Sequence, residues 1–217
     1  MSSESSTASA TVRGKAGWYK RLFASVMNSN DSYEKMVSGR KRALLSNLHG
    51  NILEIGPGTG PNLAYYPSDV RWLGIEPNPA MYPYLQREAK RLGMTFELRD
   101  GHAEQLDAAD NSMDAVVGTL VFCSVHDQQK ALQEVLRVLK PGGRYVFIEH
   151  VAAPRGTGQR RVQNLTSPLY QLTGDGCHPN RETWTAIENA GFDRVQIEHF
   201  RLDVPIVGTQ IAGYAIK

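Results

Sequence analysis

The chain has 217 residues, of which 41% are hydrophobic and 21% are charged. This length and composition favour one globular domain rather than two, with a core large enough to surround a small-molecule cleft. The formal net charge is +2 and uneven, since residues 1–50 hold eight Lys and Arg against three Asp and Glu. A surplus this small lacks the dense basic stripe of a nucleic-acid footprint, so we expect no nucleic-acid partner.

The sequence shows no pattern for secretion, for a membrane span or for a metal site. Its first residues lack the basic-then-apolar order of a secretory signal, and no run of about 18 uncharged apolar residues occurs. The two cysteines, Cys123 and Cys177, are too few for a disulfide framework and lack the paired spacing of a zinc site. We therefore expect an intracellular protein, cytoplasmic or peripherally membrane-associated, that holds no metal.

The N-terminal part predicts a tail and two helices. Residues 1–12, rich in Ser, Thr and Ala, predict a disordered tail, and residues 13–217 predict a single domain. Apolar residues from Trp18 to Met27 recur at helical spacing and predict a short amphipathic helix. A second helix is predicted over Tyr33 to Leu48. We expect these helices, within residues 14–48, to cover the functional cleft together with residues 153–179.

From residue 51 onward, short apolar segments alternate with helical or turn segments. This rhythm predicts a doubly wound parallel sheet. The predicted strands cover residues 51–55, 71–76, 94–99, 114–120, 144–150, 194–200 and 206–216.

Two connecting segments carry more specific predictions. Residues 128–139 predict a crossover helix that has Asp127 as its N-cap and ends at Pro141-Gly-Gly143. Residues 153–179 predict an irregular stretch, followed by a helix over residues 180–191.

The motif Glu54-Ile-Gly-Pro-Gly-Thr-Gly60 follows the first predicted strand. Its three glycines let the backbone pass close beneath a bound ligand before a helix that Pro61 would begin. The spacing is G-x-G-x-G rather than G-x-G-x-x-G, so the glycine that packs the helix against a dinucleotide pyrophosphate is missing. S-adenosylmethionine (SAM), which has no pyrophosphate, fits this loop.

An acid stands at the position where a ribose would be bound. Glu76 ends the second predicted strand, twenty residues beyond Gly56, and an acid there accepts hydrogen bonds from both ribose hydroxyls. Asn78 and Met81 are predicted to lie over the adenine edge, although Met81 would also suit the core. Glu54 is predicted to hold the methionine ammonium, directly or through water; the alternative is a strand-end acid satisfied by backbone amides.

Four segments together resemble the successive motifs of class I SAM-dependent methyltransferases of the type 11 group. They are Ile52-Leu-Glu-Ile-Gly-Pro-Gly-Thr-Gly60, Ile75-Glu-Pro-Asn78, Asn111-Ser-Met-Asp-Ala-Val-Val117 and Arg137-Val-Leu-Lys-Pro-Gly-Gly143. The resemblance implies a Rossmann-like α/β fold with seven mostly parallel strands, the last antiparallel, and helices on both faces. It also implies methyl transfer from SAM, with S-adenosylhomocysteine (SAH) as product.

The predicted cofactor site combines the loop, the acid and the segment after the third strand, which would reach the adenine amino group. The wider family commonly has an Asp where this sequence has His102. The predicted cofactor-binding residues are Glu54, Gly56, Pro57, Gly58, Gly60, Glu76, Pro77, Asn78, Met81, His102, Ala103, Glu104 and Leu120.

A narrower resemblance extends beyond the cofactor half. Five segments resemble mammalian methyltransferase-like proteins that methylate alkyl thiols: Thr119-Leu-Val-Phe-Cys-Ser-Val125, Glu149-His-Val-Ala-Ala153, Asp175-Gly-Cys-His178, Arg181-Glu-Thr-Trp184 and Gly213-Tyr-Ala-Ile-Lys217. The resemblance implies a small-molecule thiol acceptor. Those proteins usually begin with a hydrophobic membrane anchor, where this sequence has only the short amphipathic helix.

The acceptor side needs alignment more than strong acid-base chemistry. A thiol has a reference pKa of about 8.5 and needs modest help to become a thiolate. His150 is favoured for contacting or deprotonating the acceptor and Asp175 is second; the alternative for His150 is a strand-closing contact with backbone. Residues 165–172 predict an apolar pocket wall. The predicted acceptor contacts are Tyr19, Phe23, His126, Cys177 and His178.

Two other functions fit the same sequence. A phospholipid or amine N-methyltransferase would lie on a membrane surface through the N-terminal amphipathic helix. A SAM-binding or partner-binding module without catalytic activity would share the fold and the cofactor, because neither establishes turnover.

Overall fold

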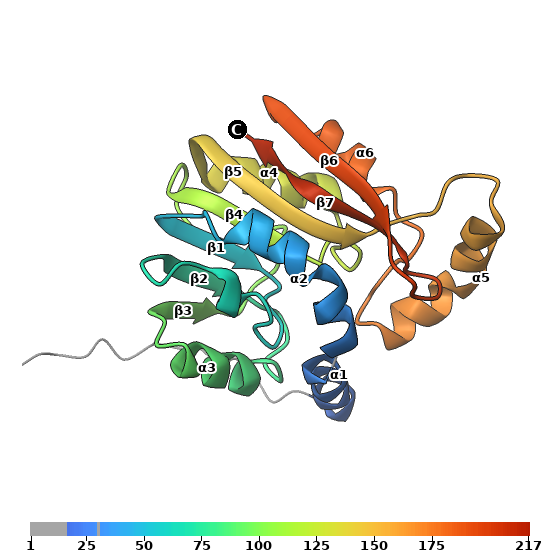
Figure 1. Ribbon diagram of the computed structural model, residues 1–217, viewed down its shortest axis with the longest axis horizontal. Helices are drawn as coiled ribbons and strands as arrows, with labels where there is room; N and C mark the ends of the chain where they lie inside the picture. The colour runs from blue at the N-terminus through green and yellow to red at the C-terminus, as the bar shows by residue number, and fades with distance from the viewer. Residues whose placement is uncertain (1–16, 30) are drawn as a thin grey trace, which may run out of the picture.

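Seven strands form a single sheet in the order β3-β2-β1-β4-β5-β7-β6 (Figure 1). The computed structural model describes residues 17–29 and 31–217, so the predicted tail over residues 1–12 lies outside the described residues. The strands are β1 (Asn51–Ile55), β2 (Arg71–Ile75), β3 (Phe96–Arg99), β4 (Met113–Thr119), β5 (Leu139–His150), β6 (Arg194–Arg201) and β7 (Thr209–Ile216). Strand β7 is antiparallel to both of its neighbours and the remaining pairs are parallel. The predicted Rossmann-like sheet with an antiparallel last strand is confirmed.

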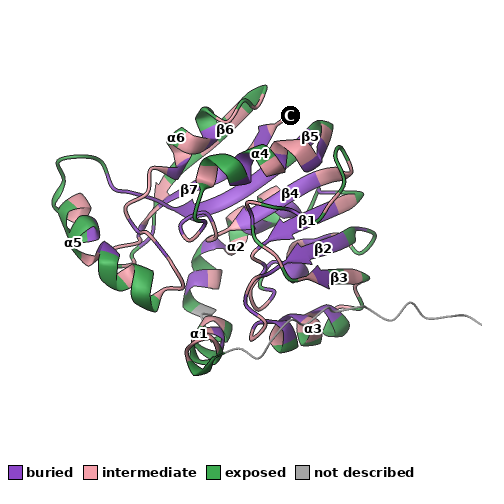
Figure 2. Cartoon of the chain, turned by 180° about the vertical axis from the view of Figure 1, so that it is seen from behind, coloured by how far each residue is buried: buried purple, intermediate pink, exposed green. Residues whose placement is uncertain are grey.

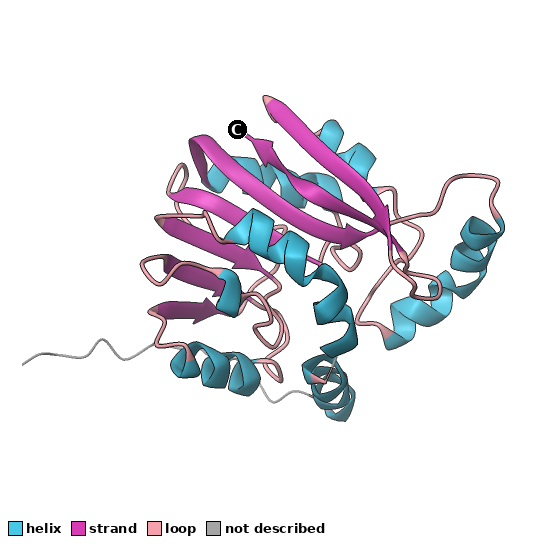
Figure 3. Ribbon diagram, in the orientation of Figure 1, coloured by secondary structure: helices cyan, strands magenta, loops and turns pink. Residues whose placement is uncertain are grey.

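Helices cover both faces of this sheet (Figure 3). They are α1 (Trp18–Asn28), α2 (Asp31–Leu45), α3 (Tyr82–Arg91), α4 (Gln128–Val138), α5 (Gly158–Thr173) and α6 (Thr183–Glu188), with one 3-10 turn, η1 (Leu63–Tyr65). Helices α4 and α6 share one apolar cluster with the sheet, whereas α2, α3 and η1 share a second cluster. Both predicted N-terminal helices are present, although α2 ends at Leu45 instead of Leu48.

The central strands divide their side chains between these two clusters. In β4, Val116 belongs to the cluster beneath α4, while Ala115 and Val117 belong to the cluster beneath α2. In β5, Tyr145 and Val146 alternate in the same way. Because both faces are covered, the central residues of these strands, 115–118 and 145–148, are apolar without alternation, and they are buried in Figure 2.

The crossover helix α4 begins as predicted but ends differently. The Asp127 side chain accepts a hydrogen bond from the Lys130 amide at 3.0 Å, which confirms the N-cap. The helix ends at Val138, and Pro141-Gly-Gly143 lies inside β5. The prediction that this turn ends the helix is wrong, because Leu139 already pairs with β4 and the turn occupies a register shift of the ladder.

Two other segments correct the sequence analysis. Residues 158–173, predicted to be irregular, form the 16-residue helix α5, in which the Thr157 side chain caps the amide of Arg160. Gly158 and the internal Pro168 hid the helical pattern, since both residues normally interrupt helices. Conversely, the segment predicted to begin a helix at Pro61 forms only the 3-10 turn η1. The chain enters β2 at Arg71, so only a short connection separates β1 from β2.

Helix α5 lies beyond the carboxyl end of β5, at the periphery of the molecule (Figure 1). Among the residues that the structure describes, no helix combines the length and the apolar character that a membrane crossing requires.

Candidate functional site

A cavity of about 1760 Å³ lies at the carboxyl ends of β1 to β4. Loops that follow these strands form its floor, and residues of α1 and α2 contribute to its wall. Ligands of doubly wound folds bind at this edge, where neighbouring connections diverge. Pockets for a single small ligand span about 300–1,000 Å³, so this cavity has room for a cofactor together with a second molecule.

The glycine loop after β1 lines the floor of this cavity. Gly56, Gly58 and Gly60 have φ angles of 59°, 56° and 90°, a backbone region that side chains strain. A Cβ at Gly56 would lie 2.6 Å from Val121 Cγ2, whereas a Cβ at Gly58 would meet nothing within 4 Å. The loop therefore packs against Val121 at Gly56, whereas at Gly58 the space beside the backbone is empty.

Glu76 lies beside this loop, with its carboxylate fixed by backbone amides. The amide of Gly58 donates to Oε2 at 2.9 Å, and the amide of Asn78 donates to Oε1 at 2.8 Å. Burial raises the pKa of Glu76 to about 7, although both hydrogen bonds favour the ionised form. Each oxygen keeps further acceptor capacity, so the carboxylate can accept two hydroxyl donors from a ligand.

Most of the predicted cofactor residues surround the same cavity. Glu104 has an additional role, because its Oε1 accepts the amides of His126 at 2.7 Å and Asp127 at 3.1 Å and so fastens the loop before α4. Those that line the cavity are Gly56, Pro57, Gly58, Gly60, Glu76, Pro77, Met81, His102, Ala103, Glu104 and Leu120.

Two predicted cofactor residues, Glu54 and Asn78, do not line the cavity. The Glu54 carboxylate accepts hydrogen bonds from Asn62 Nδ2 at 2.8 Å, Tyr66 Oη at 2.8 Å and Trp72 Nε1 at 3.0 Å. Glu54 is thus an internal polar centre of the fold, held by side chains instead of the backbone amides of the alternative interpretation. Asn78 accepts from the Ala80 amide at 3.1 Å and closes the turn after Glu76.

The acceptor side of the cavity includes only some of the predicted residues. Phe23, His126 and Asp175 line it. Tyr19 does not line it, but its hydroxyl accepts from the Asp175 amide at 3.3 Å and links α1 to that loop. His150, Cys177 and His178 were predicted to contact the acceptor, but they are not among the residues that line the cavity.

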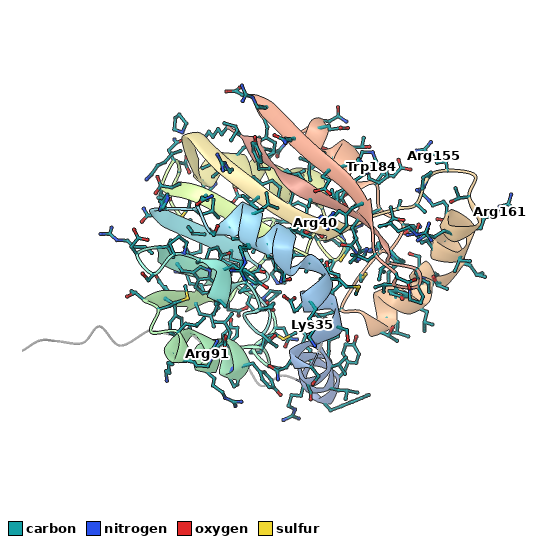
Figure 4. All side chains as sticks on the ribbon, viewed as in Figure 1. Lys35, Arg40, Arg91, Arg155, Arg161 and Trp184 are labelled. Atoms are coloured by element: carbon teal, nitrogen blue, oxygen red, sulfur yellow. The ribbon has the colours of Figure 1, made fainter. Side chains whose placement is uncertain are left out.

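The predicted apolar wall over residues 165–172 is also wrong. Leu165 and Leu172 are 82% and 75% exposed, and no residue of α5 lines the cavity. Figure 4 shows Arg161 on the same helix pointing away from the body of the protein. The composition of residues 165–172 shows that they are apolar, but it does not show whether the helix directs their side chains toward the cavity or toward solvent.

A buried ion pair at the cavity was missed by the sequence analysis. Lys41 is 2% exposed, and its Nζ lies 2.6 Å from Glu34 Oε2; both residues line the cavity. Burial lowers the pKa of Lys41, while Glu34 acts in the opposite direction. The available signal was their spacing of seven residues, which places both on one face of a helix. Its neighbour Arg40, labelled in Figure 4, instead pairs with Glu198 at 2.6 Å.

Comparison with known proteins agrees with this arrangement. A family model described as a methyltransferase domain matches residues 53–147. Thiol S-methyltransferase TMT1A of Homo sapiens is 38% identical over 198 residues, covering 85% of this chain and 81% of the relative. Thiol S-methyltransferase TMT1B of Rattus norvegicus is 41% identical over 201 residues, covering 86% and 81%. A solved SAM-dependent methyltransferase from Aquifex aeolicus has a TM-score of 0.61 at 19% identity, covering 90% of this chain and 97% of that structure.

The two glycine environments give a matched test of the loop. Gly58→Ala should lower the free energy of unfolding by about 1–2 kcal/mol, because only its positive φ is strained. Gly56→Ala should lower it by about 1–3 kcal/mol more, because its Cβ also clashes with Val121. Urea unfolding measures both, and adding Val121→Ala should recover the excess in a double-mutant cycle. Equal losses for the two single variants would contradict this account of the loop.

Proposed function

Because the chain belongs to the family of the thiol S-methyltransferases TMT1A and TMT1B, we propose that it methylates the sulfur of a small, lipophilic thiol. The protein is a SAM-dependent methyltransferase, and SAH is its product. The similarity over 85% of the chain carries the proposal, since it extends well past the matched methyltransferase domain.

The cavity suggests how SAM is held. Glu76 accepts the two ribose hydroxyls, the backbone at Gly58 supports the nucleoside, and residues 100–104 face the adenine. The buried ammonium of Lys41 lines the same cavity and is suited to pair with the carboxylate of the methionine moiety. We assign Glu54 no direct contact with SAM, because it does not line the cavity and its carboxylate accepts from three side chains inside the fold.

Methyl transfer to a thiol is an in-line displacement. The acceptor sulfur attacks the methyl carbon, the bond from that carbon to the sulfonium sulfur breaks, and its electron pair stays on the sulfur of SAH. The thiol gives up its proton, which Asp175 or water can accept at the cavity. Phe23 and Met27 of α1 line the same cavity and provide apolar contact for a lipophilic acceptor. The main contributions of the protein are alignment and exclusion of water.

The raised pKa of Glu76 predicts that SAM affinity depends on pH. Below about pH 7 the carboxyl is protonated and loses acceptor capacity, so affinity should fall toward about tenfold per pH unit as the pH decreases. Binding should also release protons near neutral pH, because the ligand favours the ionised carboxylate. Isothermal calorimetry in buffers of different ionisation enthalpy measures both effects.

Variants of Glu76 and of a control acid test whether the Glu76 carboxylate causes this pH dependence. Glu76→Gln should bind SAM weakly and without the pH dependence, and Glu76→Ala should lose most affinity, whereas Asp69→Asn, on the exposed turn before β2, should behave as wild type. Unchanged SAM affinity in Glu76→Ala would refute the ribose assignment.

Acceptor specificity is tested with labelled SAM and a panel of thiols, amines, phospholipids, phenols and carboxylates. We expect methylated thiol with stoichiometric SAH release, and little product from the other classes. Asp175→Asn should reduce kcat by roughly tenfold or more with little change in SAM affinity. Asp203→Asn, which changes an exposed residue that does not line the cavity, should leave kcat unchanged. Preference for an amine or phospholipid would replace the thiol assignment, and SAM binding without any turnover would contradict an enzyme.

A second proposal concerns peripheral contact with a membrane, where a lipophilic acceptor would accumulate. Trp18 and Leu22 of α1 are 73% and 55% exposed, and α5 exposes Leu165 and Leu172 as described. Both helices also carry basic residues, which favour anionic lipid surfaces. Both helices lie beyond the carboxyl ends of the strands (Figure 2), so one surface could contact both.

Co-sedimentation with anionic vesicles measures this contact. The full chain should pellet with the vesicles, and replacing Leu165 and Leu172 together by Glu should reduce the bound fraction several-fold without lowering SAM affinity. Met36→Glu changes an exposed apolar residue on α2 and serves as the control. Absence of vesicle binding by the wild-type chain would reject this proposal.

A further inference from the structure

Three side chains that the proposed cofactor and acceptor sites do not use meet inside the protein. They are Cys123, His150 and Cys177, which are 3%, 5% and 8% exposed. Their ligand atoms, two Sγ and one imidazole nitrogen, all lie within 4.8 Å of one another. The closest pair is Cys177 Sγ and His150 Nε2, at 3.2 Å.

These residues come from three segments that are fixed independently of one another's side chains. Cys123 lies in the loop after β4, whose Val121 and Phe122 amides both donate to Glu149 Oε1 at 3.1 Å. His150 ends β5, paired in register with β7. The segment that carries Cys177 is joined to the first loop by the His178 amide, which donates to the Cys123 carbonyl at 2.9 Å.

Core packing alone explains this group poorly. Buried cysteines often act as small apolar residues. A buried imidazole, however, requires polar partners, and the partner of His150 Nε2 is a thiol, which forms only weak hydrogen bonds. A cation that binds strongly to sulfur and to Nε2 would replace this weak contact and neutralise the two thiolates.

The donor set identifies the class of ligand. Two thiolates and one imidazole suit Zn²⁺, whereas Mg²⁺ and Ca²⁺ require oxygen ligands. Bonds of about 2.3 Å to sulfur and about 2.0 Å to nitrogen place the ligand atoms of a tetrahedron roughly 3.5–3.8 Å apart. The observed limit of 4.8 Å is within about 1 Å of that geometry, so rotations of the three side chains suffice to close the site.

We propose that Cys123, His150 and Cys177 form a Zn²⁺ site in which water completes the tetrahedron. In the described part of the chain no fourth His, Cys, Asp or Glu joins the group, which leaves one position for solvent. The ion would link the loop before α6, which carries Cys177, to the carboxyl ends of β4 and β5. Asp175, two residues before Cys177, lines the cavity, so the metal would position one wall of the acceptor side.

Metal binding is measured directly on the full chain after reduction and removal of metal by a chelator. Titration with Co²⁺ should saturate at one equivalent per chain. It should produce the intense visible bands of tetrahedral cobalt and a sulfur-to-cobalt charge-transfer band, which Zn²⁺ should then abolish by displacement. Thermal unfolding should shift upward with Zn²⁺. Weak octahedral bands, or no charge-transfer band, would overturn the proposal without affecting the methyltransferase assignment.

Variants locate the site. Loss of a residue that only supports a metal ligand already costs about 10–100-fold in affinity, so Cys177→Ser and His150→Gln should weaken Co²⁺ binding by at least about 100-fold. His49→Gln replaces an exposed histidine and should bind as wild type. Folded Cys177→Ser that retains full affinity would overturn the assignment. So would a Cys123–Cys177 disulfide that survives the reduction and excludes cobalt, as shown by counting thiols in denaturant.

Discussion

The buried carboxylate of Glu76 is the contact on which the site depends. It joins the end of β2 to the loop after β1 through the amides of Gly58 and Asn78. Amides can converge on one carboxylate only if the loop turns back sharply, which the positive φ angles of its glycines allow. The parallel pairing of β1 with β2 and β4 then brings the remaining loops to the same edge. Loop, acid and cavity are consequences of one local arrangement.

The sequence predicted the features that local rules determine. Strands appeared as short apolar runs because both faces of the sheet are covered, and Glu76 was identified by its distance from Gly56. Helix α5 was not predicted, because Pro168 and Gly158 are residues that normally interrupt a helix. The position of Glu54 away from the cavity could not be predicted, because a strand-end acid gives no indication of which face its side chain takes.

Contacts between distant segments were beyond the reach of spacing arguments. Lys41 and Arg40 are neighbouring basic residues in the sequence, yet Lys41 is buried against Glu34 whereas Arg40 pairs with Glu198. Cys123, His150 and Cys177 are separated by 27 residues in each interval and resemble no metal motif, but the sheet order places their segments together. Sequence spacing detects metal ligands that share a turn or hairpin, and it misses those that only the tertiary fold assembles.

Val121 packs against Gly56, so the loop between β4 and α4 and the glycine loop after β1 cannot move independently. The Val121 methyl group occupies the space that a side chain at position 56 would fill, and its amide is held by Glu149 next to the buried thiols. A shift of the loop before α4 would therefore be transmitted to the surface beneath the nucleoside. Substitutions there that adapt the enzyme to a new acceptor must keep this one contact, which limits how independently donor and acceptor recognition can diverge.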